Sequence, residues 1–166
     1  LGKLVESSPG TFLGLCSDGG NSGSGTVFKV TAEGEYTVLK GLQSSVDGGF
    51  PKSGLSKEIN GKFYGVTEFG GTNGFGTIFS VEESGNFNKL HNFNYTSDGA
   101  NPQSSLTING SVLVGVTATG GANNFGTIIE FDPEEEVQKL HDFSLPLGGA
   151  TPEGLISRGN TFYGIT

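Results

Sequence analysis

The sequence contains a single cysteine, Cys16, and only two histidines among its 166 residues. One cysteine excludes an intramolecular disulfide framework and a zinc site built from several thiolates. Cys16 stands where the related segments described below carry threonine, which predicts a small, packed strand residue and not a nucleophile. No Ser-His-Asp arrangement, catalytic carboxylate pair or HExxH motif can be assembled from the spacing. We therefore expect a protein that is not an enzyme and has no cofactor or metal site.

Basic residues are also few, with 9 lysines and arginines against 17 acidic residues and a formal net charge of −8. They are scattered singly, whereas nucleic-acid binding needs a clustered basic surface that displaces phosphate counterions. No apolar run approaches the roughly 18 residues that span a bilayer, and the first residues lack the pattern of a signal peptide. We expect neither nucleic-acid binding nor membrane insertion. The missing initiator methionine indicates a processed or excised segment.

Glycine is abundant, with 30 residues, but it lacks the Gly-X-Y period of collagen. Many of the glycines belong to a repeated segment, whose clearest copy is FYGVTEFGGTNGFGTIFSV at residues 63–81. The copies recur about every 50 residues, a period typical of propeller blades. Their central glycines are Gly14, Gly65, Gly115 and Gly164. This period divides the chain into repeat 1 (residues 1–50), repeat 2 (51–101), repeat 3 (102–151) and a partial repeat 4 (152–166).

Each full repeat contains four short segments with strand character. In repeat 2 the first is residues 51–59, and the Asn-Gly pair that follows suits a tight hairpin turn. The second, residues 63–67, is apolar or small on both faces, as expected for a strand buried between neighbouring sheets. The third is residues 76–81. The fourth, residues 87–93, has apolar side chains three positions apart, which predicts an outer strand with a bulge.

Four short strands per repeat, turn residues at each junction and no helical periodicity predict an all-β fold of four-stranded antiparallel propeller blades. Repeat 4 would supply only the first two strands of a blade. An open β-solenoid is the alternative, although its rungs are usually shorter. The glycine-rich loop at residues 70–76 lacks the Gly-Lys-Ser/Thr of a phosphate-binding loop and joins two strands, so we interpret it as a tight connection.

His91 and His141 occupy the same position in repeats 2 and 3, where repeat 1 has Lys40. Because separate blades hold them apart, we expect solvent-facing or hydrogen-bonded outer-strand residues and not a shared metal site. Asp47 and Asp98 recur in the turn that precedes the proline of the next repeat. A glycine replaces them in repeat 3, which weakens the case for a repeated calcium site.

The sequence of repeat 2 at residues 64–79, 90–93 and 98–102 resembles the GloVer-type tandem repeat. That repeat is found in large bacterial surface proteins with varied C-terminal anchors. The resemblance covers essentially the whole chain. It implies a propeller-like fold and a secreted or cell-surface location, and it transfers no catalytic residue. Repeat 1 departs from the pattern at residues 13–16, and repeat 3 departs from it at residues 128–130.

We expect an extracellular structural or adhesive repeat protein that associates head to tail with other copies of itself, as a ring or filament, or that is a segment of a larger surface propeller. An incomplete propeller leaves apolar blade surfaces uncovered, and repeats bury such surfaces only against other repeats. The candidate interface residues lie in the equivalent elements of repeats 1 and 4: Leu4, Leu13, Leu15, Leu155, Ile156, Phe162, Tyr163 and Ile165.

Two other functions stay open. A carbohydrate-binding, lectin-like propeller would need exposed aromatic platforms, for which Phe69, Phe75 and Phe125 are the candidates, but repeat 1 has none in that loop. A hydrolase whose catalytic residues lie outside this sequence is the third class. Asn94 and Asn109 begin Asn-X-Ser/Thr triplets and are candidate glycan-attachment sites.

Overall fold

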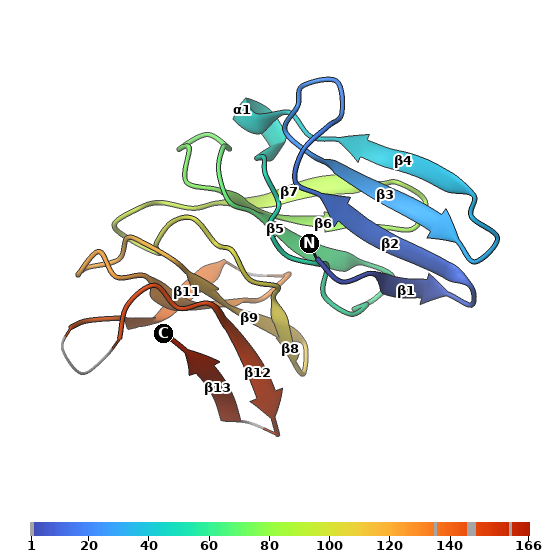
Figure 1. The fold of residues 1–166 in the computed structure, drawn as a ribbon. Helices are drawn as coiled ribbons and strands as arrows, with labels where there is room; N and C mark the ends of the chain where they lie inside the picture. The colour runs from blue at the N-terminus through green and yellow to red at the C-terminus, as the bar shows by residue number, and fades with distance from the viewer. Residues whose placement is uncertain (1, 135, 146–148, 160) are drawn as a thin grey trace.

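The computed structural model describes residues 2–134, 136–145, 149–159 and 161–166. These residues form an all-β protein with antiparallel sheets of two to four strands, which confirms the predicted fold class at that level. Figure 1 shows the sheets following one another in chain order, from the blue N-terminal sheet to the red C-terminal hairpin. Within the described ranges none of the sheets closes on itself. No described helix is long and apolar enough to cross a membrane.

The described residues form four sheets, which we number by the repeat that contains them. Sheet 1 has the order β1-β2-β3-β4, with β1 (Val5–Ser8), β2 (Thr11–Cys16), β3 (Thr26–Thr31) and β4 (Tyr36–Gly41). Sheet 2 has the order β5-β6-β7, with β5 (Phe63–Thr67), β6 (Thr77–Val81) and β7 (Phe87–Asn92). Sheet 3 has the order β11-β10-β9-β8, with β8 (Thr107–Asn109), β9 (Val112–Thr117), β10 (Thr127–Phe131) and β11 (Val137–Asp142). Sheet 4 is the hairpin of β12 (Gly154–Arg158) and β13 (Thr161–Ile165).

Two details of the strand pattern are confirmed. Every residue of β5 is buried, as its apolar or small residues on both faces predict. The outer strand of sheet 2 carries the predicted bulge, because the pairing of β6 with β7 shifts between Ile78 and Phe79. The same shift occurs at Val27 and Phe28 in sheet 1 and at Ile128 and Ile129 in sheet 3.

The first segment of repeat 2 differs from the prediction. Residues 51–59 do not form a strand, and sheet 2 has three strands where four were predicted. Ser56 explains part of this, because its backbone N–H donates to the Tyr64 carbonyl while its hydroxyl accepts from the Tyr64 N–H at 3.0 Å. A side-chain hydroxyl thus replaces one rung of the backbone ladder.

A one-turn helix, α1 (Ser44–Asp47), is the second difference, since no helical segment was predicted. The backbone N–H groups of Val46 and Asp47 both donate to the Gln43 carbonyl, which closes the turn. Four residues are too few for a periodic pattern, so the apolar spacing gave no signal.

The apolar core lies between successive sheets. One cluster joins sheets 1 and 2 around Leu13, Phe63 and Phe79. A second joins sheets 2 and 3, and it contains Tyr64, Val66, Ile78, Phe93, Leu106, Leu113, Ile129 and Phe131. Glycine at the centre of β5 is required by this packing, because a Cβ at Gly65 would collide with the Phe79 ring. Sheets 1 and 2 therefore each have their core completed by the next sheet.

Candidate functional site at the junction of repeats 2 and 3

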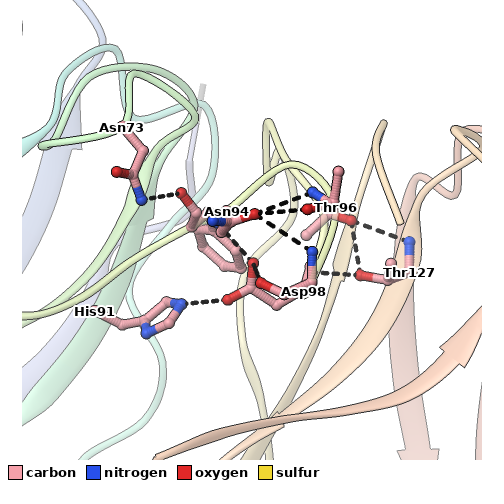
Figure 2. Close-up of polar contacts among 9 residues, drawn as sticks. Asn73, His91, Asn94, Thr96, Asp98 and Thr127 are labelled. Carbon is pink, nitrogen blue, oxygen red and sulfur yellow. Dashed lines mark hydrogen bonds and ion pairs between the residues drawn. The ribbon is translucent and has the colours of Figure 1, made fainter. Parts of the chain in front are cut away.

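Asp98 is the centre of a polar network at this junction. Its side chain is buried, with the residue only 7% exposed. Asp98 Oδ1 accepts the Asn94 backbone N–H at 2.6 Å, and Asp98 Oδ2 lies 2.6 Å from His91 Nε2 (Figure 2). Because a carboxylate only accepts hydrogen bonds, His91 Nε2 is the donor. The carboxylate therefore ties the end of β7 to the turn that follows it.

The backbone of Asp98 connects this turn to the next sheet. The Thr127 hydroxyl on β10 donates to the Asp98 carbonyl oxygen at 2.7 Å, and it lies 2.9 Å from the Thr117 hydroxyl on β9. Figure 2 shows Thr127 reaching this turn from the neighbouring sheet. One residue thus bonds to sheet 2 through its side chain and to sheet 3 through its carbonyl. We call this arrangement the aspartate clasp.

The loop beside the clasp is ordered by amide side chains. Asn94 Oδ1 accepts hydrogen bonds from the backbone N–H and the hydroxyl of Thr96, at 3.2 and 3.0 Å (Figure 2). Asn73, from the glycine-rich loop, donates its Nδ2 to the Phe93 carbonyl at 3.0 Å. The glycine-rich loop is therefore pinned to the end of β7, in agreement with its interpretation as a structural connection.

Repeats 1 and 2 are joined by the same clasp. Asp47 Oδ2 lies 3.0 Å from Lys40 Nζ and accepts the Gln43 backbone N–H, while its carbonyl accepts the Thr77 hydroxyl at 2.8 Å. The recurring aspartates predicted from the sequence are thus both engaged by donors within the protein. No group of three or more potential metal-ligating side chains occurs in the described part of the chain.

A polar cleft of about 390 Å³ opens beside the clasp at the junction of repeats 2 and 3. Its walls come from both repeats: Leu90, His91, Ser97, Asp98, Phe131, Glu136, Val137 and Lys139. His91 is fixed on its other side by Phe93, whose ring meets the imidazole edge to face at 5.3 Å. The second ring nitrogen of His91 points away from Asp98 (Figure 2).

The cleft exists because of specific side-chain differences between the repeats. At the junction of repeats 1 and 2, Phe87 occupies the position of Val137, and Lys40 Nζ lies 5.1 Å from the centre of its ring. Lys40 corresponds to His91, so the second junction has shorter side chains at both positions. Sequence reasoning missed the cleft, although a position-by-position comparison of the repeats would have shown the two exchanges.

The charges around the cleft are largely compensated. Lys139 Nζ lies 2.9 Å from Asp142 Oδ2. Burial raises the pKa of the Asp142 carboxyl, but the hydrogen bond from the Ala122 backbone N–H and the contact with Lys139 outweigh burial and hold this pKa below its usual range. Asp142 therefore stays ionised and keeps Lys139 beside the cleft.

The candidate interface residues separate into buried and exposed groups. Leu13 and Leu15 belong to the core between sheets 1 and 2, since alternation along β2 points them toward sheet 2. Leu155 and Phe162 are half-buried. The exposed members are Leu4 (52%), Ile156 (71%), Tyr163 (54%) and Ile165 (68%). Ile156, Tyr163 and Ile165 share one side of sheet 4, which we call the forward face, and line a shallow groove of about 430 Å³.

The forward face repeats a surface that is buried elsewhere. Tyr163 and Ile165 occupy the positions of Tyr64 and Val66, which are 3% and 1% exposed because repeat 3 covers them. The opposite end of the protein shows the complementary surface, which we call the backward face of sheet 1. Its residues Leu4, Phe12, Phe28 and Val30 occupy the positions of the buried Leu106, Leu113, Ile129 and Phe131.

The remaining candidates are dispersed over the surface. Asn94 is exposed and Asn109 is half-buried in β8. Phe69 is exposed, whereas Phe75 is half-buried and packs against Tyr95 with ring centres 5.3 Å apart. Phe125 and Cys16 are half-buried, and His141 is exposed.

Comparison with known proteins gives one match to a family. The sequence profile of the Gloeobacter/Verrucomicrobia repeat matches residues 1–166. No curated protein matches the sequence. Among solved structures the chain is similar to a protein assigned as a 6-phosphogluconolactonase from Bacteroides fragilis NCTC 9343, with 18% sequence identity and a TM-score of 0.49. The match covers 86% of this chain and 40% of that one, and we draw no conclusion about fold or activity from it.

Proposed function

The chain belongs to the Gloeobacter/Verrucomicrobia repeat family, and from that premise we propose that it is a structural repeat module that associates head to tail. The forward face of one copy binds the backward face of sheet 1 in a second copy. The contact joins two different surfaces, so it generates a ring or a filament. Its repeats act as blades of a propeller-like array, and each of the four sheets forms one layer of that array.

The equivalence of the end faces with the buried interfaces carries this proposal. Tyr64 and Val66 are covered by the Leu106 and Leu113 positions of the next repeat. The forward face carries the equivalents of Tyr64 and Val66. The backward face of sheet 1 carries the equivalents of Leu106 and Leu113. Burying large apolar side chains contributes roughly 1.5–3 kcal/mol each, which supports docking of one face onto the other.

The proposal includes a secreted or cell-surface location. It rests on the resemblance of these repeats to those of large bacterial surface proteins. Limited proteolysis of intact producing cells tests it: the protein should be cleaved from outside while a cytoplasmic marker stays intact. Protection of the protein until the cells are lysed would contradict the location.

Sedimentation velocity at micromolar concentrations tests the association. We expect species larger than one chain for the native sequence, and a monomer for the double variant Tyr163→Ser/Ile165→Ser, which makes the forward face polar. The matched control is Ser157→Asn, which changes an exposed residue on the opposite side of the same hairpin. A native chain that stays monomeric, or a control that dissociates as readily as the face variant, would contradict head-to-tail association.

A further inference from the structure

The two clasp junctions differ in one respect that the structural role does not require. Both have the buried aspartate, a lysine or histidine partner on the outer strand, and a threonine hydroxyl of the next sheet that donates to the aspartate carbonyl. A polar cleft of about 390 Å³ lies beside the clasp at the junction of repeats 2 and 3, whereas at the junction of repeats 1 and 2 Lys40 Nζ lies 5.1 Å from the centre of the Phe87 ring. This volume lies within the range of about 300–1,000 Å³ that small-molecule sites occupy.

Three positions create the cleft and set its chemistry. His91 replaces Lys40, and Val137 replaces Phe87, so the volume taken by the lysine and the aromatic ring becomes free. The third exchange is Ser97 at the position of Val46, which puts a hydroxyl where repeat 1 has an exposed apolar side chain.

The polar groups of the cleft are held in place before any ligand arrives. Asp98 fixes the orientation of His91 through the 2.6 Å hydrogen bond, and Phe93 packs edge to face against the imidazole. Lys139 is positioned by Asp142 at 2.9 Å. Groups that are already oriented lose little conformational entropy on binding, which favours affinity for a small ligand.

The lining combines donors, acceptors and an apolar side. Ser97 and Lys139 offer O–H and N–H donors, the second ring nitrogen of a neutral His91 offers an acceptor because Nε2 donates to Asp98, and Glu136 offers an exposed carboxylate acceptor. Leu90 and Val137 supply the apolar side. A sugar ring matches this mixture, because its hydroxyls both donate and accept while its C–H groups pack on aliphatic side chains.

The charges disfavour an anionic ligand. Lys139 is paired with Asp142, and His91 is paired with Asp98, so neither group leaves a net positive charge for an anion. We propose that this cleft is a binding site for a neutral saccharide, a hexose or N-acetylhexosamine residue. The inference goes beyond the proposed head-to-tail association, since the cleft lies between repeats 2 and 3 and involves neither end face.

Nuclear magnetic resonance titration of the isotope-labelled chain tests the proposal directly. The probes are free D-glucose, D-galactose, D-mannose, N-acetyl-D-glucosamine and N-acetyl-D-galactosamine, each added separately. We expect saturable shifts for at least one of them at His91, Ser97 and Lys139, and no such shifts at the junction of repeats 1 and 2. Absence of saturable shifts with all five sugars, or shifts centred elsewhere, would overturn the proposal.

A variant taken from the protein's own first junction provides the matched test. His91→Lys/Val137→Phe restores the lysine and the aromatic ring that fill the equivalent space beside Asp47, and the introduced lysine can pair with Asp98 as Lys40 pairs with Asp47. We expect at least a tenfold loss of sugar affinity with an unchanged unfolding midpoint or a higher one. Sugar affinity that survives in the folded double variant would overturn the site.

The converse exchange tests whether sugar binding can be gained at the first junction. Lys40→His/Val46→Ser/Phe87→Val should open a second cleft and add a second set of saturable shifts around Asp47. The control His141→Lys makes the same chemical change at an exposed position outside the cleft, and sugar affinity should stay the same. Loss of affinity in this control would contradict the assignment. Since these variants leave Tyr163 and Ile165 intact, failure of sugar binding and failure of self-association are separate results.

Discussion

The junction between repeats 1 and 2 and the junction between repeats 2 and 3 have the same backbone clasp but different side-chain filling. The carbonyl distances agree, with Thr77 to Asp47 at 2.8 Å and Thr127 to Asp98 at 2.7 Å. The partner of the carboxylate differs, since Lys40 serves the first clasp and His91 serves the second. The hydrogen bonds to the carbonyl therefore set the spacing of the sheets, while the size of the outer-strand side chains decides whether a cleft remains.

Removing a clasp carboxylate should have the largest effect on stability. In Asp98→Ala the Asn94 N–H and the His91 ring lose their buried acceptor, and we expect a loss of roughly 3 kcal/mol in the free energy of unfolding. Urea denaturation measures it, with Glu136→Ala as a control that removes an exposed carboxylate from the same region. A loss no larger than that of the control would show that the clasp does not hold the junction.

Removing the hydroxyl of Thr77 or of Thr127 should cause a smaller loss of stability, and the loss should be the same at both junctions. Thr77→Val and Thr127→Val keep the shape of the side chain but remove the hydroxyl that donates to the aspartate carbonyl, so each should cost about 1–2 kcal/mol. Urea denaturation of the two variants side by side measures the difference. Because the two contacts are alike in length, costs that differ by more than about 1 kcal/mol would break the comparison.

The smallest effect concerns the glycine-rich loops, which are pinned by Asn92 in repeat 2 and by Asp142 in repeat 3. Asp142 has a folded-state pKa below its usual range, so its contribution is complete above the unfolded pKa near 4 and is lost as pH falls through the folded pKa. Asp142→Asn keeps an acceptor for the Ala122 N–H but removes the titration. Unfolding midpoints measured from pH 7 to pH 2 should therefore fall less steeply in the variant than in the native chain.

The opposite result would change the interpretation of this loop. Equal slopes in the two proteins would show that Asp142 binds protons alike in the folded and unfolded states, and that Lys139 is not held by it. The converse exchange, Asn92→Asp in repeat 2, places a carboxylate three residues after Lys89, as Asp142 follows Lys139, and this carboxylate accepts the Thr72 backbone N–H. It should therefore steepen the fall of the unfolding midpoint at low pH.

Much of the fold could be predicted because the period and the strand pattern are properties of neighbouring residues. The burial of β5 follows from its apolar or small residues on both faces, and the outer bulge follows from apolar spacing that fits neither two-residue nor helical alternation. The helix α1 and the irregular segment at residues 51–59 could not be predicted this way. They depend on single hydrogen bonds, such as the one between the Ser56 hydroxyl and the Tyr64 N–H.

The candidate site was only partly accessible to sequence reasoning. A hydrogen-bonded histidine on the outer strand was expected, and His91 has that contact. The cleft was not predicted, because it depends on which side chains of two different repeats face one another. Leu13 and Leu15 show the same limit: their apolar character is evident, but which neighbour covers them depends on the direction in which β2 faces.

The clasp also has a consequence for how the protein opens. Asp98 lies in repeat 2, yet its carbonyl is the acceptor for a threonine of repeat 3, so sheet 2 cannot unfold without breaking a bond in its neighbour. Cooperative units of unfolding should then cross the repeat boundaries, with nearest-neighbour coupling of the kind expected for one-dimensional arrays. Amide protons of β9 and β10 would exchange together with those of β7, and sheet 4, which lacks a complete clasp in the described residues, would exchange first.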